Sequence, residues 1–179
     1  MESLNKLFED TLRDIYYAEK AILKNLPKMA KKAGSEKLAA AFEEHIEQTE
    51  GQVERLEKIF EMLDKAPRGK RCPAIDGLAE EAGEIMQEFK DETVRDAGML
   101  AAAQAVEHYE ISRYGTLVAW AEKLGMTDAV DLLNATLEEE KLTDAKLSQL
   151  AESEINIDAE GAGDKGSSGK RRARREAAE

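Results

Sequence analysis

Acidic side chains at helical spacing are the part of this sequence best suited to chemistry. Glu107 and Glu110 lie three residues apart in AQAVEHYEISRYG (residues 103–115), where the other inward positions are Ala, Ile and Val. Side chains three apart share one face of an α-helix. Ionised carboxylates in an apolar core cost several kcal/mol each unless a cation lies among them. The pair therefore predicts a bound metal ion.

Counting residues from two glycines adds further candidate ligands. If Gly34 and Gly125 each mark the turn of a helical hairpin, side chains equally far from a turn lie in one layer. Glu19 and Glu110 each lie 15 residues before their glycine, and Glu140 lies 15 residues after Gly125. The apolar rows of the same helices also contain a histidine and an aspartate. The predicted ligands are Glu19, His45, Glu107, Glu110, Glu140 and Asp144.

Iron and manganese fit this set, because both ions accept carboxylates together with an imidazole. No Lys or Arg is expected in the inward rows at this level, so metal is the economical partner of the acids. Glu138 and Glu139 belong to an acidic run and are expected to face solvent. Two alternatives stay open: the glutamates could be solvated, and His45 could be an ordinary hydrogen-bonded residue.

Five helices are needed to position these side chains. Apolar residues recur every three or four positions along most of the chain, which indicates long amphipathic helices. Glycine, proline and capping residues divide the pattern. The predicted helices cover residues 3–33, 35–63, 74–90, 93–124 and 128–153.

The predicted helices pair into two antiparallel hairpins. MAKKAGSEKLAAAF and WAEKLGMTDAVDLL superpose without a gap on Gly34 and Gly125, which indicates an internal repeat. A long connection, about residues 66–92, holds the shorter helix and joins the hairpins. One long crossover distinguishes ferritin-like bundles from up-down bundles. The predicted fold is all-α, a ferritin-like four-helix bundle with a short crossover helix.

Charge separates a folded domain, residues 1–157, from a tail, residues 158–179. The tail carries six basic and five acidic side chains, a net charge of +1, so the domain carries −13 against −12 for the whole chain. An acidic domain repels nucleic acid. The tail lacks apolar periodicity and is expected to be disordered. Its basic cluster, residues 170–175, predicts at most weak DNA binding, and a solubilising tail is the alternative.

The composition favours a soluble, cytoplasmic protein. No apolar run approaches the roughly 18–20 residues that cross a bilayer, and the N-terminal residues lack a signal-peptide pattern. The single cysteine, Cys72, has no partner for an internal disulfide, in agreement with a reducing compartment. Partners in a membrane are therefore not expected.

Several motifs resemble the YciF/YciE-like stress proteins of the ferritin-like superfamily, over about residues 4–155. The similar segments are AEKAILKNLPKMA, TEGQVERL, GLAEEAGE, VRDAGMLAAAQAVEHYEISRYGTL and TLEEEKLTDAKL. The resemblance implies a stress-linked, homodimeric helical protein. EHYEISRYG is also similar to the third bundle helix of rubrerythrins, which implies that Glu107 and Glu110 are ligands, and Glu140 matches a further ligand.

The sequence departs from the di-iron pattern of that superfamily on the remaining helices. Where Glu-x-x-His is expected, this chain has Thr49 with Gln52, and Glu140 with Thr143. Tyr16 stands at the position of the first-helix glutamate. These departures weaken the case for a symmetric two-iron site.

The expected function is stress protection through iron or manganese bound in the bundle centre. The resemblance leaves open metal oxidation, sequestration and peroxide detoxification, and hence whether the protein is a ferroxidase-like or peroxidase-like enzyme. One alternative is a non-enzymatic dimeric stress protein whose site has decayed. The other is a protein that associates with DNA through its tail.

Overall fold

The computed structural model describes residues 2–162, and these residues form helices and loops without a strand. Five α-helices lie within one or two residues of the predicted bounds, except that the last one ends at Leu150, three residues before the predicted end at residue 153. A π-helical turn, Ala151–Ile155, follows the last of them. The helices are α1 (Leu4–Lys32), α2 (Glu36–Met62), α3 (Pro73–Glu88), α4 (Glu92–Lys123) and α5 (Thr127–Leu150).

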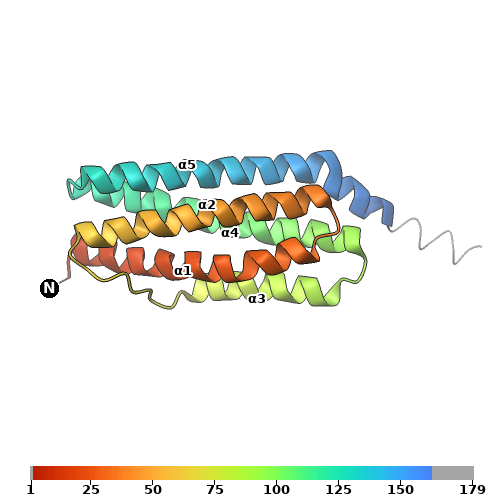
Figure 1. Cartoon of the computed structure of the whole chain (residues 1–179), viewed down its shortest axis with the longest axis horizontal. Helices are drawn as coiled ribbons and strands as arrows, with labels where there is room; N and C mark the ends of the chain where they lie inside the picture. Colours follow the sequence, from red (N-terminus) through yellow and green to blue (C-terminus); the bar gives the residue numbers. More distant parts are fainter. Residues whose placement is uncertain (1, 163–179) are drawn as a thin grey trace, which may run out of the picture.

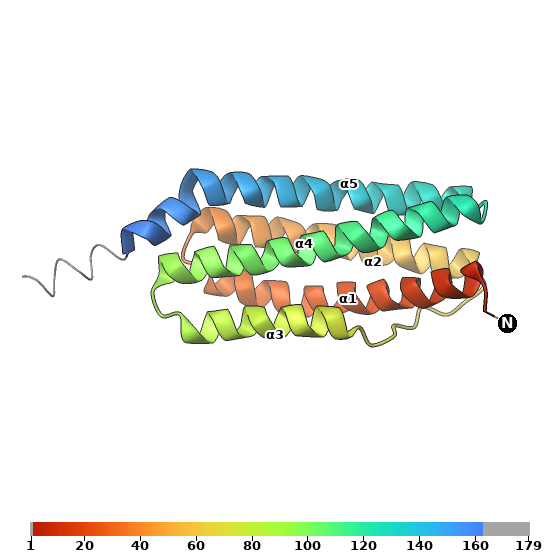
Figure 2. The ribbon, with the colours of Figure 1, turned by 180° about the vertical axis from the view of Figure 1, so that it is seen from behind.

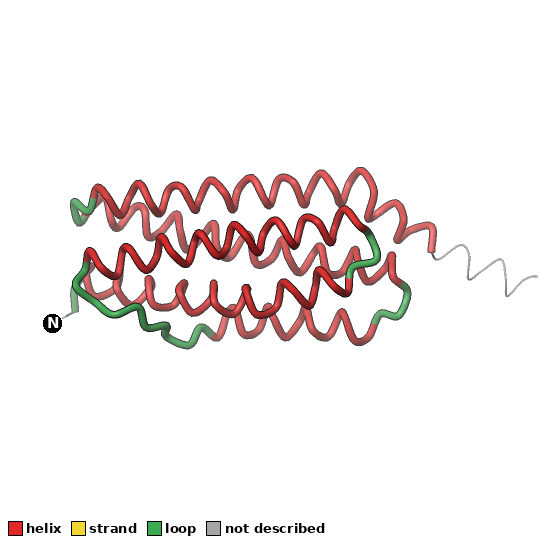
Figure 3. The backbone as a smooth tube through the Cα atoms, in the orientation of Figure 1, coloured by secondary structure: helices red, strands yellow, loops and turns green. Residues whose placement is uncertain are grey.

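The helices form the predicted four-helix bundle with a crossover (Figure 1). α1 packs on α2, and α4 packs on α5, as two antiparallel hairpins. α2 and α4 run in the same direction, so the chain must return along the bundle between them. Residues 63–72 make part of this return, and α3 completes it against α1 and α4, on the outside of the bundle (Figures 2 and 3). The ferritin-like fold class is confirmed.

The two hairpin turns, predicted to be equivalent, differ in structure. Gly125 has φ +72°, and its N–H donates to Glu122 O while Met126 N–H donates to Ala121 O, at 3.1 and 3.0 Å. This is a Schellman ending, which favours glycine. Gly34 instead lies against Asp96 of α4. The Asp96 carboxylate accepts the Gly34 N–H at 3.0 Å and the Ser35 N–H at 2.7 Å.

Apolar side chains fill the bundle on both sides of a central polar layer. Phe8, Leu12 and Phe60 are fully buried where α1 begins and α2 ends. Leu26 and Leu38 are buried toward the opposite end. The polar layer is therefore shielded from water along the bundle axis in both directions.

The helical backbone continues past residue 157, the predicted end of the domain. Ala151 and Ile155 of the π-helical turn are buried, and the turn contacts α4. The backbone is helical from residue 156 to residue 162. Residue 157 thus lies inside a helical segment, and Ile155 is the last buried side chain among the described residues. Residues 163–179, with the basic cluster at 170–175, lie outside the described residues.

Within residues 2–162, no helix combines the length and apolar composition that crossing a bilayer requires.

Replacing Asp96 should test how the two hairpins are joined. We expect Asp96→Ala to lower the free energy of unfolding by about 1–3 kcal/mol, because two backbone N–H groups lose their acceptor. Urea denaturation followed by circular dichroism measures this. Asp131→Ala, on the exposed face of α5, is the matched control and should change stability little. Equal effects of the two substitutions would contradict the assigned role of Asp96.

Candidate metal centre

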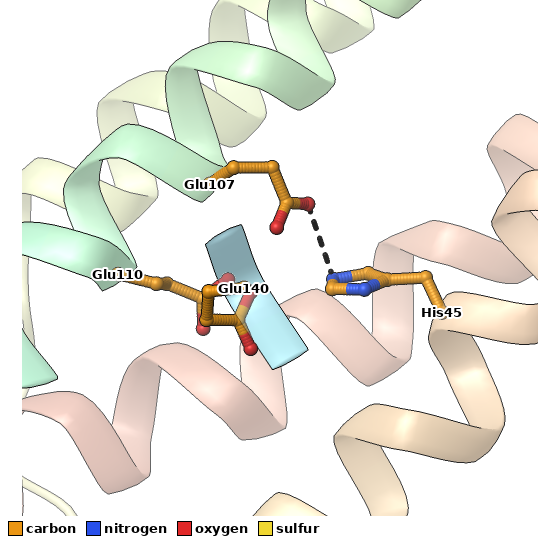
Figure 4. Close-up of side chains that lie close together, drawn as sticks. All are labelled: His45, Glu107, Glu110 and Glu140. Atoms are coloured by element: carbon orange, nitrogen blue, oxygen red, sulfur yellow. Dashed lines mark ion pairs between the residues drawn. The ribbon is translucent and has the colours of Figure 1, made fainter. Parts of the chain in front are cut away.

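Four metal-ligating side chains meet in the middle of the bundle. His45 comes from α2, Glu107 and Glu110 from α4, and Glu140 from α5 (Figure 4). One ligand atom of each lies within 4.8 Å of all the others. Two oxygens on opposite sides of one ion are about 4 Å apart when each bond is about 2.0–2.2 Å long. The cluster is therefore close to the size of a single metal coordination sphere.

Burial of these side chains follows from the helix period. Glu107 and Glu110 occupy the face of α4 that also carries Ala103 and Tyr114, and all four are buried. Glu140 continues the inward row of Leu133 and Leu137 on α5. Glu107 is 2% exposed and Glu110 and Glu140 are 0% exposed, so their predicted inward placement is confirmed.

Much of the polar surface of the cluster has no hydrogen-bond partner among the described residues. Both carboxylate oxygens of Glu110, one each of Glu107 and Glu140, and both ring nitrogens of His45 are unpaired. His45 Nε2 lies 3.4 Å from Glu107 Oε1, the contact drawn in Figure 4. Buried polar atoms are normally hydrogen-bonded, and a binding site for an ion is one recognised cause of exceptions.

Glu19 adjoins the cluster but stands outside its tight core. Its side chain is completely buried, and Tyr114 of α4 donates its hydroxyl to Glu19 Oε1. The second oxygen has no hydrogen-bond partner within residues 2–162. Burial, and then the charge of Glu140, raise the pKa of Glu19 to about 8, although the Tyr114 bond acts in the opposite direction. Glu19 is therefore a buried neighbour of the four clustered side chains and not one of them.

Asp144 lies farther out than the other predicted ligands. Its side chain is 23% exposed, and His108 Nε2 lies 3.2 Å from Asp144 Oδ1. His108 itself is exposed. The structure therefore brings four of the six predicted ligands into one cluster, sets Glu19 beside them and leaves Asp144 outside, partly exposed and next to His108.

The absence of a nearby basic residue was predicted wrongly. Arg55 of α2 is half-buried and donates to Glu139 at 2.8 Å and to Thr136 at 2.9 Å. Glu139, predicted to face solvent, is half-buried as well. Gln52 connects this ion pair to the cluster, since its amide donates to Glu139 at 3.2 Å and to Glu140.

The register of α2 against α5 explains these contacts. The two helices run antiparallel, so residue numbers in contact rise on one as they fall on the other. Thr143 donates to Gln48, and Arg55 lies opposite Thr136. Counting from the hairpin glycines relates helices within a hairpin but not α2 to α5. The sequence signal for Arg55 was its spacing from Gln52, three residues away on the same face.

Burial and like charge make the cluster reluctant to ionise. Burial raises the pKa of Glu107 to about 11, with further increases from the neighbouring Glu140. Burial also raises the pKa of Glu110 well above its ordinary value, and the charge of Glu19 adds to this. Burial lowers the pKa of His45, which keeps the imidazole neutral and able to bind a metal.

The donor set fits a hard or borderline divalent cation. Three carboxylates with one neutral imidazole are ligands of iron and manganese. Arg55 is already paired with Glu139, so it leaves the charge of the inner carboxylates uncompensated. The inner carboxylates therefore require either protons or a cation to balance their charge.

Comparisons with known proteins agree with this architecture. The chain is 45% identical to the protein YciF of Escherichia coli (strain K12) over 161 residues, 89% of this chain and 97% of YciF. The crystal structure of the E. coli stress protein YciF superposes with a TM-score of 0.83, at 44% identity, over 87% of this chain and 99% of that one.

Two further solved structures are similar. YcfI of Rhodopseudomonas palustris is 50% identical, with a TM-score of 0.81 over 82% of this chain and 94% of that one. A protein of Xanthomonas campestris, at 22% identity and a TM-score of 0.67, shares the fold over 90% of this chain and 99% of that one. Residues 3–160 match the family described as a domain of unknown function (DUF892). This chain, with its two helical hairpins around a buried carboxylate cluster, therefore belongs to the DUF892 family, together with the stress protein YciF.

Proposed function

We propose that this protein binds iron or manganese at the centre of its bundle and acts in stress protection. His45, Glu107, Glu110 and Glu140 would hold the ion, with Glu19 and Asp144 beside them. The observation that carries the proposal is the convergence of three buried carboxylates and one neutral imidazole with unpaired atoms facing one another. The proposed stress role rests on the similarity of this chain to YciF, which is described as a stress protein.

A cation would relieve the electrostatic cost of this layer more completely than protons. Protonated carboxyls each donate one hydrogen bond, but the several unpaired oxygens and His45 nitrogens outnumber the donors nearby. A divalent ion accepts several of these atoms at once. When bound, iron or manganese would supply one-electron redox chemistry or hold an oxidant as a Lewis acid.

Side chains around the cluster would orient its ligands. Gln52 donates to Glu140, and the Arg55–Glu139 pair in turn fixes Gln52. Tyr114 does the same for Glu19. Such outer partners hold ligands in place and tune the metal. The proposed homodimer is supported by the family resemblance alone. Metal oxidation, metal sequestration and peroxide detoxification remain the candidate activities of the protein.

Neutral substitutions at the cluster should weaken metal binding. We expect Glu107→Gln and Glu110→Gln to weaken manganese binding by at least about 10–100-fold, the range seen even for outer-shell changes. Isothermal titration under anaerobic conditions measures affinity, and elemental analysis measures stoichiometry. Glu138→Gln on the exposed face of α5 is the control. Wild-type protein that takes up neither iron nor manganese would refute the proposal and leave the non-enzymatic alternative.

Stability of the metal-free protein should fall as the pH rises. Glu19 has a folded pKa of about 8 and Glu107 of about 11, against an ordinary value of 4.5. A pKa raised by folding stabilises the fold below the unfolded value, and this contribution is lost as the pH approaches the folded value. We therefore expect the free energy of unfolding to drop by a few kcal/mol from about pH 5 to about pH 8.

Added manganese should reverse this trend, because the ion stabilises the ionised carboxylates and competes with protons. Urea denaturation with and without the ion, at both pH values, measures the effect. Glu107→Gln should flatten the pH dependence of the metal-free protein. A stability that rises with pH in the absence of metal would contradict the assignment of protonated, buried carboxyls.

A further inference from the structure

An apolar crevice leads from beneath the crossover helix to the cluster. It has a volume of about 40 Å³ and lies between α1, α3 and α4. Its walls are mostly aliphatic, with Leu26, Ile75, Ala82 and Ala103 among them, and its inner end is formed by His45 and Glu107. The volume exceeds the roughly 10–15 Å³ that one water molecule requires on the same measure. The crevice can therefore hold a very small molecule beside the proposed ligands.

A wider hollow between α1 and α3 adjoins the crevice. This outer hollow has a volume of about 350 Å³ and shares Asn25, Met29, Ala79 and Ala82 with the crevice. Lys28 and Lys32 border it. The Asn25 amide donates to the carbonyl of Ala21 and its oxygen accepts from Lys28, so both ends of this side chain are occupied. These four shared residues, here called the neck, line both spaces and lie between the crevice and the outer hollow.

The chemistry of this passage selects against ions. A cation would meet Lys28 and Lys32 at the mouth, and any ion would lose its hydration along aliphatic walls. Water needs two to four polar partners to occupy a cavity, which the neck does not provide, and apolar cavities of this kind stay dry and bind xenon. Small size and apolar walls together favour an uncharged gas molecule.

We infer that the crevice binds dioxygen and conducts it to the His45–Glu107 side of the cluster. The delivery role rests on the proposed function, because the electrons come from the bound metal. Iron held by His45, Glu107, Glu110 and Glu140 would supply these electrons, since two one-electron oxidations of ferrous ion, with two protons from solvent, reduce one dioxygen molecule to hydrogen peroxide. The fold thereby assigns α3, which contributes none of the proposed ligands, the role of forming the gas passage.

Xenon binding tests the crevice without any metal. Crystals of the metal-free protein pressurised with xenon should show an anomalous peak between α1, α3 and α4, next to Ala82 and Ala103. Ala82→Leu should remove the peak by filling the neck. Ala74→Leu, on the exposed face of the same helix, is the matched control and should retain it. A wild-type crevice without xenon would overturn the inference.

Oxidation kinetics test delivery in the iron-loaded protein. Ala79→Leu, at a half-buried neck position that tolerates added volume better, should slow oxidation of bound ferrous ion by dioxygen at least about 10-fold, a barrier increase of about 1.4 kcal/mol. Ferrous affinity, measured anaerobically, and the circular dichroism spectrum should match those of Ala74→Leu.

The two hypotheses fail in different ways. Wild-type protein that binds no iron refutes the proposed function. Ala79→Leu protein that binds iron normally and is oxidised at the wild-type rate overturns the inference alone. Equal slowing of oxidation by hydrogen peroxide would also overturn the assignment of dioxygen, because it would show a passage that does not discriminate against a polar oxidant.

Discussion

Mutual repulsion among buried carboxylates is the constraint on which this structure depends. Glu107, Glu110 and Glu140 come from two helices of one hairpin, and Glu19 comes from the other hairpin. Packing the hairpins together removes all four from water. The apolar layers at either end supply the free energy that makes this burial tolerable, since each aliphatic side chain contributes about 1.5–3 kcal/mol when fully buried. The folded bundle therefore buries a layer of carboxyl groups whose desolvation and mutual repulsion destabilise it.

The two sides of the cluster differ in polarity. Toward α2 and α5, the Arg55–Glu139 pair and Gln52 form a connected network that reaches half-exposed positions. Here the charge of Arg55 is already neutralised by Glu139. Toward α3, the crevice has one polar side chain besides His45 and Glu107 among the described residues, and this side chain, Asn25, is already hydrogen-bonded at both ends. A cation entering from solvent therefore meets acceptor oxygens on the first side and aliphatic walls on the second.

The sequence predicted the helices and the inward glutamates because both depend on local periodicity. Glu110 and Glu140 share rows with apolar residues, and the row sets which face is buried. The role of Arg55 depends on the register between α2 and α5, which no local pattern encodes. The turn at Gly34 was misjudged for a similar reason. Its amide is held by Asp96, far along the chain, whereas Gly125 satisfies its turn through its own helix.

The crossover helix gives the long connection a role besides joining α2 to α4. A connection between parallel α2 and α4 is obligatory, but a loop would suffice to make it. The helix places small side chains, Ala79 and Ala82, toward α1 and α4. Small side chains at this seam leave an incompletely filled space, which costs stability in a core that is otherwise close-packed. An unfilled, apolar space that ends at His45 and Glu107 is consistent with passage of a gas and has no evident purpose in a purely structural bundle.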